Sequence, residues 1–415
     1  MLEGVAASAI APRLRHLVHL PFTAWTGLGL LTAGLMWIAC RWTTSPSARE
    51  RLLVAASVAV LAALVTLPLA IAWVLHALAV FFVVERCRPR WLAVMLVTCL
   101  LAAMVLLPVL YVGWLGERGR LAREFVAFGT NMALLRLWGH AADRWQGTSP
   151  VTPVRRFLLG TMFFPTFVNG PIEATRQLPE PWPAPGLREL HTGLRRIALG
   201  VTKLTVTALL FPAGWIDPLA HAATDASGLV LWGWGARLYV WFYLSFSAWS
   251  DVAIGLGALT GHVVVENFDA PWRALEPADF WHRWHVSLGL WLRDRVYIPL
   301  GGNRRHRAVN VGATFTVSVL WHVWGTLKLL GLGYFPARAW GGFFVWGALN
   351  TAGVLLGRPL ARAVPTDSAV AHAGLRLATF LFACLCWVPF FLPPSVPLDA
   401  ALGMLARMLW PIHGS

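Results

Sequence analysis

The sequence carries little charge for its length, and most of that charge has one sign. Charged residues make up 13% of the 415 residues, about half of what a soluble domain usually carries. Acidic residues number 19 against 34 basic ones, which gives a formal net charge of +15 at pH 7. Hydrophobic residues reach 57%, and long apolar runs recur from Pro21 to Trp410. A membrane span needs about 20 mostly apolar residues, so this composition excludes a soluble protein and predicts a multi-pass membrane protein.

The basic residues lie in short clusters between the apolar segments, at 41–51, 86–90 and 304–307. Nearly all of them are arginines, since Lys203 and Lys328 are the only lysines. In a soluble protein such an excess would suggest nucleic-acid binding. Cytoplasmic loops of membrane proteins, however, collect Arg and Lys in this pattern. We therefore interpret the clusters as cytoplasmic loops beside membrane lipids and expect no nucleic-acid partner.

Motifs of several common site types are also missing. The five cysteines are odd in number and scattered, which excludes a disulfide framework. Cys384 and Cys386 have no His or carboxylate near them in the sequence, so packing explains them better than metal binding. There is no G-x-S-x-G, no P-loop and no H-E-x-x-H. We expect neither a metal site nor a bound cofactor.

Two stretches interrupt the apolar segments. Residues 148–196 contain eight prolines, a density that no helix survives. Residues 267–307 mix Trp with His, Arg and Asp. Non-helical backbone at membrane depth persists only where protein or water surrounds it. We expect an all-α polytopic membrane protein, one domain over residues 1–415, with about ten or eleven transmembrane helices and a few partial or re-entrant helices.

Local patterns predict some boundaries and contacts. The apolar run 52–84 is too long for one span, and Pro68 is expected to divide it into a hairpin. Gly255, Gly257 and Gly261 lie in an apolar segment, which favours a role in close helix packing over a nucleotide fold. Asp251 precedes them; it either fixes a helix junction or helps line a polar cavity, and the structural role is favoured.

Segment 278–302 is the first candidate for chemistry. At helical spacing, one face of a helix would present an imidazole among apolar side chains, while arginines lie on the other face. The apolar face comprises Trp281, His285, Leu288 and Leu292; the other comprises His282, Arg283, Gly289 and Arg293. An interfacial anchor would explain the arginines and tryptophans but not His285. A single histidine there is, by itself, more often a satisfied core residue.

His322 is the second candidate, because it is the only titratable group between residues 308 and 327. Ionisable residues within membrane segments are rare and are candidates for function, and imidazole suits a base near pH 7.

The turn and basic cluster at 301–307 has two interpretations. It anchors the chain beside anionic headgroups, or it binds the phosphates of an acyl donor or an acidic carrier protein.

These motifs resemble a known family, the membrane-bound O-acyltransferases. Residues 280–304, from Phe-Trp-His-Arg-Trp-His to Gly-Gly-Asn-Arg, resemble its signature, and the bacterial alginate O-acetylation group is the most similar branch. Residues 164–172 resemble its F-P-x-x-x-x-G-P-I, and residues 246–257 its F-S-G-Y-S-D-x-A-I-G-x-G, followed by Glu-Asn-Phe at 266–268. Leu-Trp-His at 320–322 resembles the stretch that carries the family's histidine. The core motif region spans residues 164–325.

The resemblance implies transfer of an acetyl or other acyl group from acetyl-CoA to a hydroxyl of an exported polysaccharide or envelope glycan. His322 would be the base and His285 a second polar residue, both near the narrowest point of a central tunnel. The protein would lie in the bacterial inner membrane, and a periplasmic acetyltransferase is a candidate partner. Further candidates for lining the tunnel or binding the donor are Trp281, Arg283, Trp284, Ser287, Arg293, Asp294, Trp321, Asp251, Asn303 and Arg304.

Some positions depart from the family pattern, among them Ala248-Trp249, His282 and Val323-Trp324. They bear on the acceptor more than on the reaction. The D-alanylation branch fits less well than the alginate branch. Three alternatives stay open: acylation of a small molecule or lipid, a transporter that uses the intramembrane His and Asp as a path, and a structural scaffold of an export complex.

Overall fold

The computed structural model describes residues 19–115, 120–212, 214–216, 218–219, 225–330, 340–364, 368–392 and 396–410. Within these residues the regular structure is helical, and the one β-type pairing is a bridge between Phe268 and Trp284. The expectation of an all-α protein is therefore confirmed. The chain forms two compact units: the N-terminal unit, Leu17–Thr205 with Ser247–Glu266, and the C-terminal unit, Val206–Phe246 with Asn267–Ser415. The expected single domain over 1–415 stays a prediction.

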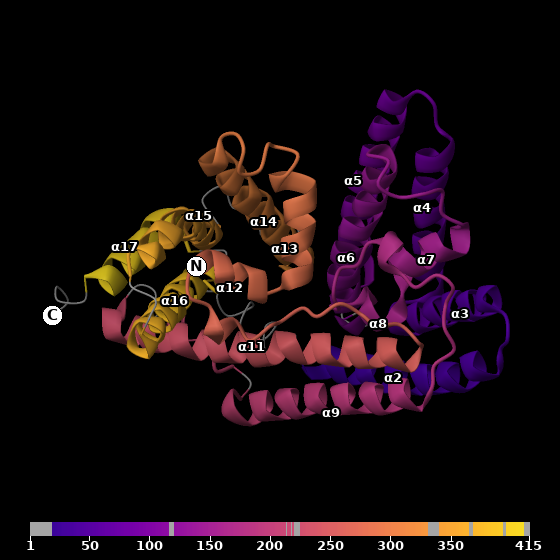
Figure 1. Ribbon diagram of the computed structural model, residues 1–415, viewed down its shortest axis with the longest axis horizontal. Helices are drawn as coiled ribbons and strands as arrows, with labels where there is room; N and C mark the ends of the chain where they lie inside the picture. The colour runs from indigo at the N-terminus through magenta and orange to yellow at the C-terminus, as the bar shows by residue number, and fades with distance from the viewer. Residues whose placement is uncertain are drawn as a thin grey trace. The chain divides into compact units, whose positions relative to one another are not determined.

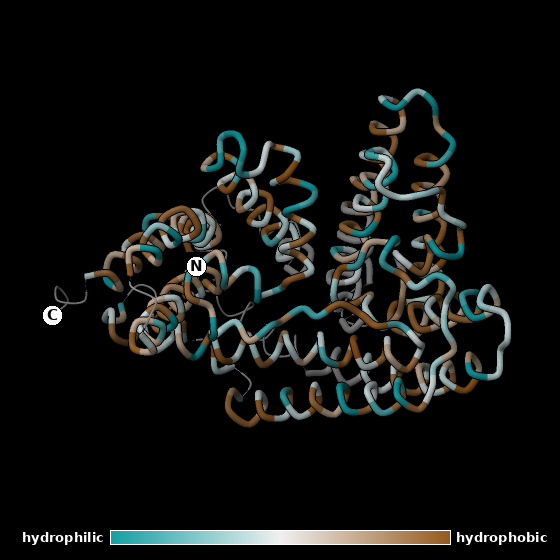
Figure 2. Tube along the Cα trace, viewed as in Figure 1, coloured by the Kyte–Doolittle hydropathy of each residue, from teal (hydrophilic) through white to brown (hydrophobic). Residues whose placement is uncertain are grey.

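The N-terminal unit is built on long helices joined by short turns (Figure 1). Figure 2 shows hydrophobic residues along these helices, with hydrophilic residues interspersed on some of them and at the turns. The helices are α2 (His19–Trp42), α3 (Pro46–Leu64), α4 (Leu67–Arg86), α5 (Arg90–Leu115), α6 (Arg120–Trp145), α7 (Val154–Met162), α8 (Phe164–Phe167) and most of α9 (Leu187–Leu210), with a 3₁₀ turn, η2, at Thr175–Gln177.

The C-terminal unit contains short helices between long ones. Helix α11 (Gly228–Leu259) begins in this unit and ends in the N-terminal unit. The rest are η3 (Pro271–Arg273), α12 (Pro277–Arg283), α13 (Val286–Leu292), the π-helical η4 (Arg293–Tyr297), α14 (Arg307–Leu330), α15 (Gly341–Arg362), α16 (Ala369–Phe390) and α17 (Leu398–Leu409). Helix α15 packs against α14, α16 and α17.

Helix lengths are consistent with a polytopic membrane protein. Ten helices in the described part of the chain have 19 or more residues, close to the length that a span needs. Three of the helices found there, α4, α11 and α16, also have the apolar composition to cross a membrane. The protein is thus a multi-pass membrane protein, and the number of crossing helices stays a prediction.

Two local predictions agree with the structure. Helix α3 ends at Leu64, and α4 begins at Leu67 with Pro68 in its first turn. A proline fits there because the backbone N–H groups of a helix's first turn have no partner within the helix. Helices α9 and α11 approach closely within the N-terminal unit, because a side chain added at Gly255 would lie 2.7 Å from the carbonyl oxygen of Gly193. Gly255 therefore serves helix packing, as expected.

The proline-rich stretch is held by side chains from neighbouring elements. Arg136 of α6, which is buried, donates through Nη2 to the carbonyl oxygens of Thr166 and Pro171 at 2.8 and 3.0 Å. Trp182 donates through Nε1 to the carbonyl oxygen of Thr260 at 2.8 Å. These side chains therefore bind backbone carbonyl groups of the irregular segments inside the protein. Irregular backbone can lie at membrane depth only where its polar groups are bound in this way.

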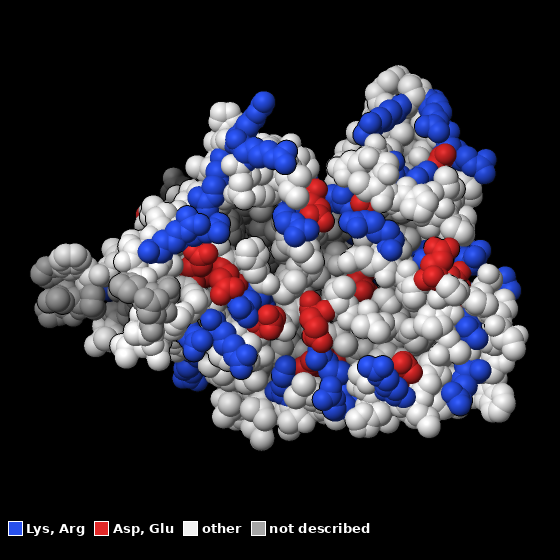
Figure 3. Space-filling view, viewed as in Figure 1, with Lys and Arg blue, Asp and Glu red and all other residues white. Residues whose placement is uncertain are grey.

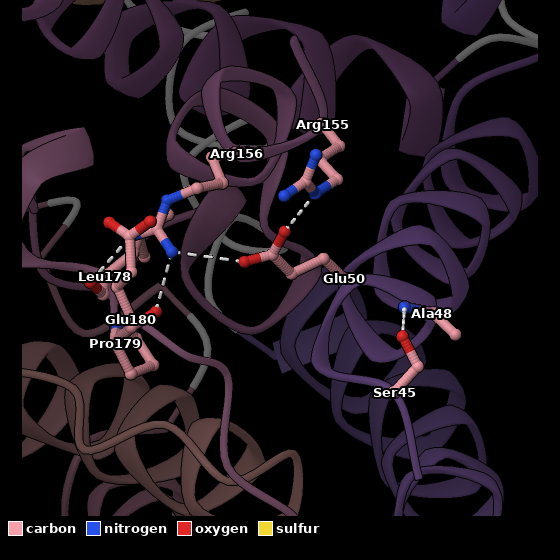
Figure 4. A network of polar contacts seen from close by, with 8 residues as sticks. All are labelled: Ser45, Ala48, Glu50, Arg155, Arg156, Leu178, Pro179 and Glu180. Atoms are coloured by element: carbon pink, nitrogen blue, oxygen red, sulfur yellow. Dashed lines mark hydrogen bonds and ion pairs between the residues drawn. The ribbon is translucent and has the colours of Figure 1, made fainter. Parts of the chain in front are cut away.

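A buried carboxylate joins α3, α7 and the loop after η2. Figure 3 shows acidic groups lying beside basic ones on one face of the molecule, and Figure 4 shows one such set from close by, with Glu50 between Arg155 and Arg156. Arg156 lies 3.1 Å from Glu50 and also donates to the carbonyl oxygens of Leu178 and Pro179. The side chain of Glu50 is only 4% exposed, so this network fastens the irregular segment to α3.

We expect Glu50→Gln to lower the free energy of unfolding by about 3 kcal/mol, because it removes the buried carboxylate and leaves the buried Arg156 with only the carboxylate of the exposed Glu180. Glu180→Gln is the matched control, since the Glu180 side chain is 73% exposed and lies 3.4 Å from the same arginine; its loss should cost less than about 1 kcal/mol. Thermal and denaturant unfolding in one detergent would measure both. Equal losses in the two variants would contradict the role given to Glu50.

Candidate functional site

The chain breaks at His285, between α12 and α13. Sequence periodicity predicts one helix through Trp281 and His285, and this is wrong: α12 ends at Arg283 and α13 begins at Val286. His285 has φ 47° and ψ 51°, a left-handed conformation that is rare for residues other than glycine. Such a conformation costs about 1–3 kcal/mol and persists only where the surroundings impose it.

A short antiparallel pairing imposes this conformation. The backbone N–H of Asp269 donates to the carbonyl oxygen of Arg283 at 2.9 Å, and that of Val286 donates to the carbonyl oxygen of Asn267 at 3.0 Å. Phe268 and Trp284 form the bridge between these bonds. Residues on both sides of His285 are therefore held by residues 267–269, and the helix cannot continue through it.

The side chain of Asn267 holds the imidazole of His285. Its Oδ1 lies 3.1 Å from Nδ1 of His285, and it also accepts from the backbone N–H and the hydroxyl of Ser287 at 3.2 and 2.9 Å. Because a backbone N–H can only donate, the shared atom is the amide oxygen and not the nitrogen. Nδ1 of a neutral His285 therefore carries the proton, and Nε2 carries the basic lone pair.

His322 also carries its proton on Nδ1, but it lies within a helix and not at a break between two helices. It lies on α14, and its Nδ1 is 2.7 Å from the carbonyl oxygen of Ser318, one helical turn earlier. A carbonyl oxygen only accepts, so neutral His322 also carries its proton on Nδ1 and its lone pair on Nε2. The side chain is partly exposed, in contrast to the buried Ser318. The two candidate catalytic residues therefore present the same kind of nitrogen.

Aromatic rings surround both imidazoles. Ring centroids of Trp321, Phe390, Trp346 and Phe343 lie 4.8, 5.1, 5.6 and 6.2 Å from that of His322. The ring of Phe246 lies 4.7 Å from that of His285.

A row of rings joins the two histidines. Phe246 contacts Phe242, and Phe242 contacts Phe390, at centroid distances of 5.6 and 6.0 Å. The two imidazoles also lie close enough to interact electrostatically. His285 and His322 therefore lie at the two ends of one row of aromatic rings, in apolar surroundings where each is best kept neutral.

Trp281 and Trp284 belong to this aromatic cluster. Trp281 donates through Nε1 to Oδ1 of Asn350 at 2.9 Å, and the amide nitrogen of Asn350 donates to the carbonyl oxygen of Trp346 at 2.8 Å. Asn350 thereby links α12 to α15. Trp284 is buried and packs against Phe280, Tyr239 and other rings. These contacts position the chain segment that carries His285.

Four charged candidates are already in ion pairs. Arg283 binds Asp279 at 2.9 Å and Asp269 at 3.2 Å, and Arg293 binds the adjacent Asp294 at 2.8 Å. Asp251 lies in the N-terminal unit, where it pairs with Arg196 at 2.8 Å and Lys203 at 2.6 Å. The fixation of a helix junction, which was the favoured role for Asp251, agrees with this pairing.

Asn303 and Arg304 lie on an exposed turn that is held from within. Oδ1 of Asn303 accepts from the hydroxyl of Tyr297 at 2.7 Å. The buried Asn310 donates to the carbonyl oxygens of Gly302 and Arg305 at 2.9 and 2.7 Å. The turn is therefore ordered while its arginines face outward.

Sequence reasoning missed Asn267 and Asn350 as parts of the site. The Glu-Asn-Phe stretch at 266–268 was the one available signal for Asn267, and nothing local marks Asn350. Among the residues that the structure describes, no three His, Cys, Asp or Glu side chains are grouped so that they could bind a metal ion. The expectation that no metal or bound cofactor is needed stays a prediction.

Comparison with known proteins gives one family. Residues 157–335 match the model of the MBOAT, membrane-bound O-acyltransferase family. A probable alginate O-acetylase AlgI from Pseudomonas fluorescens is 30% identical over 220 residues, which are 49% of this chain and 44% of that protein. The corresponding protein of Pseudomonas aeruginosa is 31% identical over 261 residues, 60% of this chain and 45% of that protein.

A peptidoglycan O-acetyltransferase from Helicobacter pylori is 29% identical over 265 residues, 61% of this chain and 46% of that protein. The chain thus spans less than half the length of the curated relatives it matches. The resemblance of the motif region 164–325 to the family, and to its alginate branch, is confirmed, since that region lies within the matched residues.

The left-handed backbone at His285 generates a prediction. His285→Gly and His285→Ala both remove the imidazole and its bond to Asn267. We expect the glycine variant to be more stable by about 1 kcal/mol, because a Cβ disfavours this conformation and glycine does not. Unfolding of the two variants in the same detergent would measure the difference.

His282, in α12, provides the control. There glycine should be less stable than alanine by about 1 kcal/mol, as in any helix. If alanine were the more stable substitution at both positions, the strained conformation of His285 would be wrong.

Proposed function

We propose that the chain is a membrane O-acyltransferase, because residues 157–335 match the model of the membrane-bound O-acyltransferase family and the chain is similar to alginate O-acetylases. It takes an acetyl group from acetyl-CoA and transfers it to a hydroxyl of an exported polysaccharide or another envelope glycan, directly or through a periplasmic acetyltransferase. We place it in the inner membrane of a bacterium.

The position of the proton on His322 carries the proposal. Since Nδ1 donates to Ser318 at 2.7 Å, Nε2 is the nitrogen left to accept a proton. The carbonyl oxygen of Ser318 belongs to the helix, so it holds the ring in one orientation. A base that is oriented in advance and surrounded by aromatic rings is suited to take a proton from a hydroxyl.

In the proposed reaction, His322 moves the proton and no metal takes part. As the hydroxyl oxygen bonds to the thioester carbonyl carbon, its proton moves to Nε2 of His322. The carbon–sulfur bond then breaks, and the departing thiolate of coenzyme A takes the proton from Nε2. His322 returns to its neutral form, and the products are the ester and free coenzyme A.

His285 supplies a second neutral nitrogen acceptor beside the first. Its Nε2 suits a hydrogen bond from the acceptor or from an amide of the donor, which would orient the reactants. Trp281, Trp284, Ser287 and Trp321 would then shape the site around them, and Arg283, Arg293 and Asp294 would hold its structure through their ion pairs.

The names of the relatives support a glycan acceptor. Alginate O-acetylase and peptidoglycan O-acetyltransferase are both named for transfer of acetyl groups to glycans. Both names also support acetyl as the acyl group. The identity of this chain's own acceptor and the passage of the acetyl group through a tunnel are parts of the proposal.

We expect His322→Ala to lower the turnover of radiolabelled acetyl-CoA by about 10²–10⁴-fold, the contribution of a positioned general base. Purified protein in nanodiscs, supplied with cell-envelope extract as a source of acceptor, would be assayed for label transfer. His191→Ala, a histidine exposed on α9, is the control and should turn over at the wild-type rate. Equal rates for wild type and His322→Ala would remove His322 as the base.

The exposed turn generates a second prediction, about the donor. Arg304 and Arg305 are exposed on an ordered turn, so we propose that they bind the phosphates of acetyl-CoA. The double variant Arg304→Ala/Arg305→Ala should raise KM for acetyl-CoA by about tenfold, as expected for the loss of one or two charge-assisted hydrogen bonds, and leave kcat nearly unchanged.

The effect on KM should weaken as salt is added, because salt screens exposed charges. Arg358→Ala is the control, since the Arg358 side chain is also largely exposed. An unchanged KM in the double variant would limit this turn to contact with lipid headgroups.

A further inference from the structure

We propose that Asn267 is a positioning residue, whose side-chain oxygen keeps the proton of His285 on Nδ1 and thereby keeps Nε2 available as an acceptor. This inference rests on the proposed function for its effect on acyl transfer. The position of the proton itself is a property of the folded protein and can be measured without any transfer.

The first support is the number of donors that converge on one atom. Oδ1 of Asn267 receives the backbone N–H of Ser287, the hydroxyl of Ser287 and Nδ1 of His285, at 2.9–3.2 Å. Asn267 is fully buried. If this side chain exchanged its oxygen for its nitrogen, the bond from the backbone N–H of Ser287 would be lost, so the oxygen stays in place and Nδ1 of His285 faces an acceptor.

The second support is that main-chain bonds hold the turn around His285 in addition to this side chain. The turn around His285 is held by main-chain bonds from Val286 to Asn267 and from Asp269 to Arg283. These bonds use the carbonyl and N–H groups of residues 267–269 and would survive a change of side chain. The amide oxygen of Asn267 satisfies the backbone N–H of Ser287, and its bond to Nδ1 of His285 is an additional role.

The third support is the contrast with His322. There a backbone carbonyl fixes the proton, and no substitution can remove it. At His285 the chain leaves a helix, so no carbonyl of the preceding turn is available to Nδ1. Oδ1 of Asn267 accepts the hydrogen bond from Nδ1 instead. The hydrogen bond on one ring nitrogen determines which nitrogen stays basic, and both imidazoles thereby end in the same form.

The tautomer can be measured directly. Protein labelled with ¹⁵N-histidine gives distinct nitrogen signals for protonated and unprotonated ring nitrogens, and comparison with His285→Gln would identify the signals of His285. The variant Asn267→Leu removes the acceptor while it keeps a similar volume. Asn267→Asp keeps an oxygen at the same place. Asn131→Leu, which removes another buried asparagine, in the N-terminal unit, controls for a general loss of stability.

We expect wild type, Asn131→Leu and Asn267→Asp to show a proton on Nδ1 of His285. In Asn267→Leu the Nδ1 proton should be lost from most molecules, with the proton moved to Nε2. The label transfer rate of Asn267→Leu should fall about tenfold or more through kcat, and Asn267→Asp at alkaline pH, where the imidazolium is not populated, should recover most of that loss.

The position of the proton and the transfer rate together test the role of Asn267. A His285 that keeps its proton on Nδ1 in Asn267→Leu would overturn the proposal. A moved proton with an unchanged transfer rate would also overturn it, because the position of the proton would then have no bearing on the reaction. A moved proton in a protein whose wild type transfers no acyl group would support the role of Asn267 in the tautomer and would count against the proposed function alone.

Discussion

Two hydrogen bonds at Nδ1 determine what chemistry the C-terminal unit can perform. One runs from His322 to the carbonyl oxygen of Ser318, and the other from His285 to the side chain of Asn267. Because both partners only accept, both imidazoles offer the same nitrogen as a base when they are neutral. Rings from α11, α14, α15 and α16 surround them, so the reactive nitrogens are set in position before any substrate arrives.

Much of the fold could be predicted because its causes are local. The scarcity of charge indicates a membrane protein, and Pro68 marks the start of α4 because a proline fits the first turn of a helix. Gly255 marks a close approach of α9 and α11. The number of crossing helices is harder to predict, since helices that face protein on several sides tolerate polar residues, and their composition then resembles that of a soluble helix.

Candidate residues for the site could be named from the sequence, but their geometry could not. His322 stands out as the one titratable group of its segment, and His285 as an imidazole among apolar neighbours. The break at His285 has no local signal, because a histidine does not favour left-handed backbone and is held there by residues 267–269, which lie far from it in sequence. For the same reason Asn350 was missed: its partner Trp281 lies 69 residues away.

The two units differ in the partners of their buried ionisable side chains. In the N-terminal unit, buried acids meet bases directly: Glu50 pairs with Arg156, Asp251 with Lys203, and Glu173 with His262. Ion pairs of this kind hold helices and irregular backbone together. In the C-terminal unit, His285 and His322 instead donate to neutral acceptors, which bind one ring nitrogen and leave the other basic.

Burying a charged group without an opposite charge is costly. An imidazole can be buried at the lowest cost, because it can remain neutral. His285 and His322 therefore each keep a basic nitrogen, while the ion pairs of Arg283, Arg293 and Asp294 serve the fold.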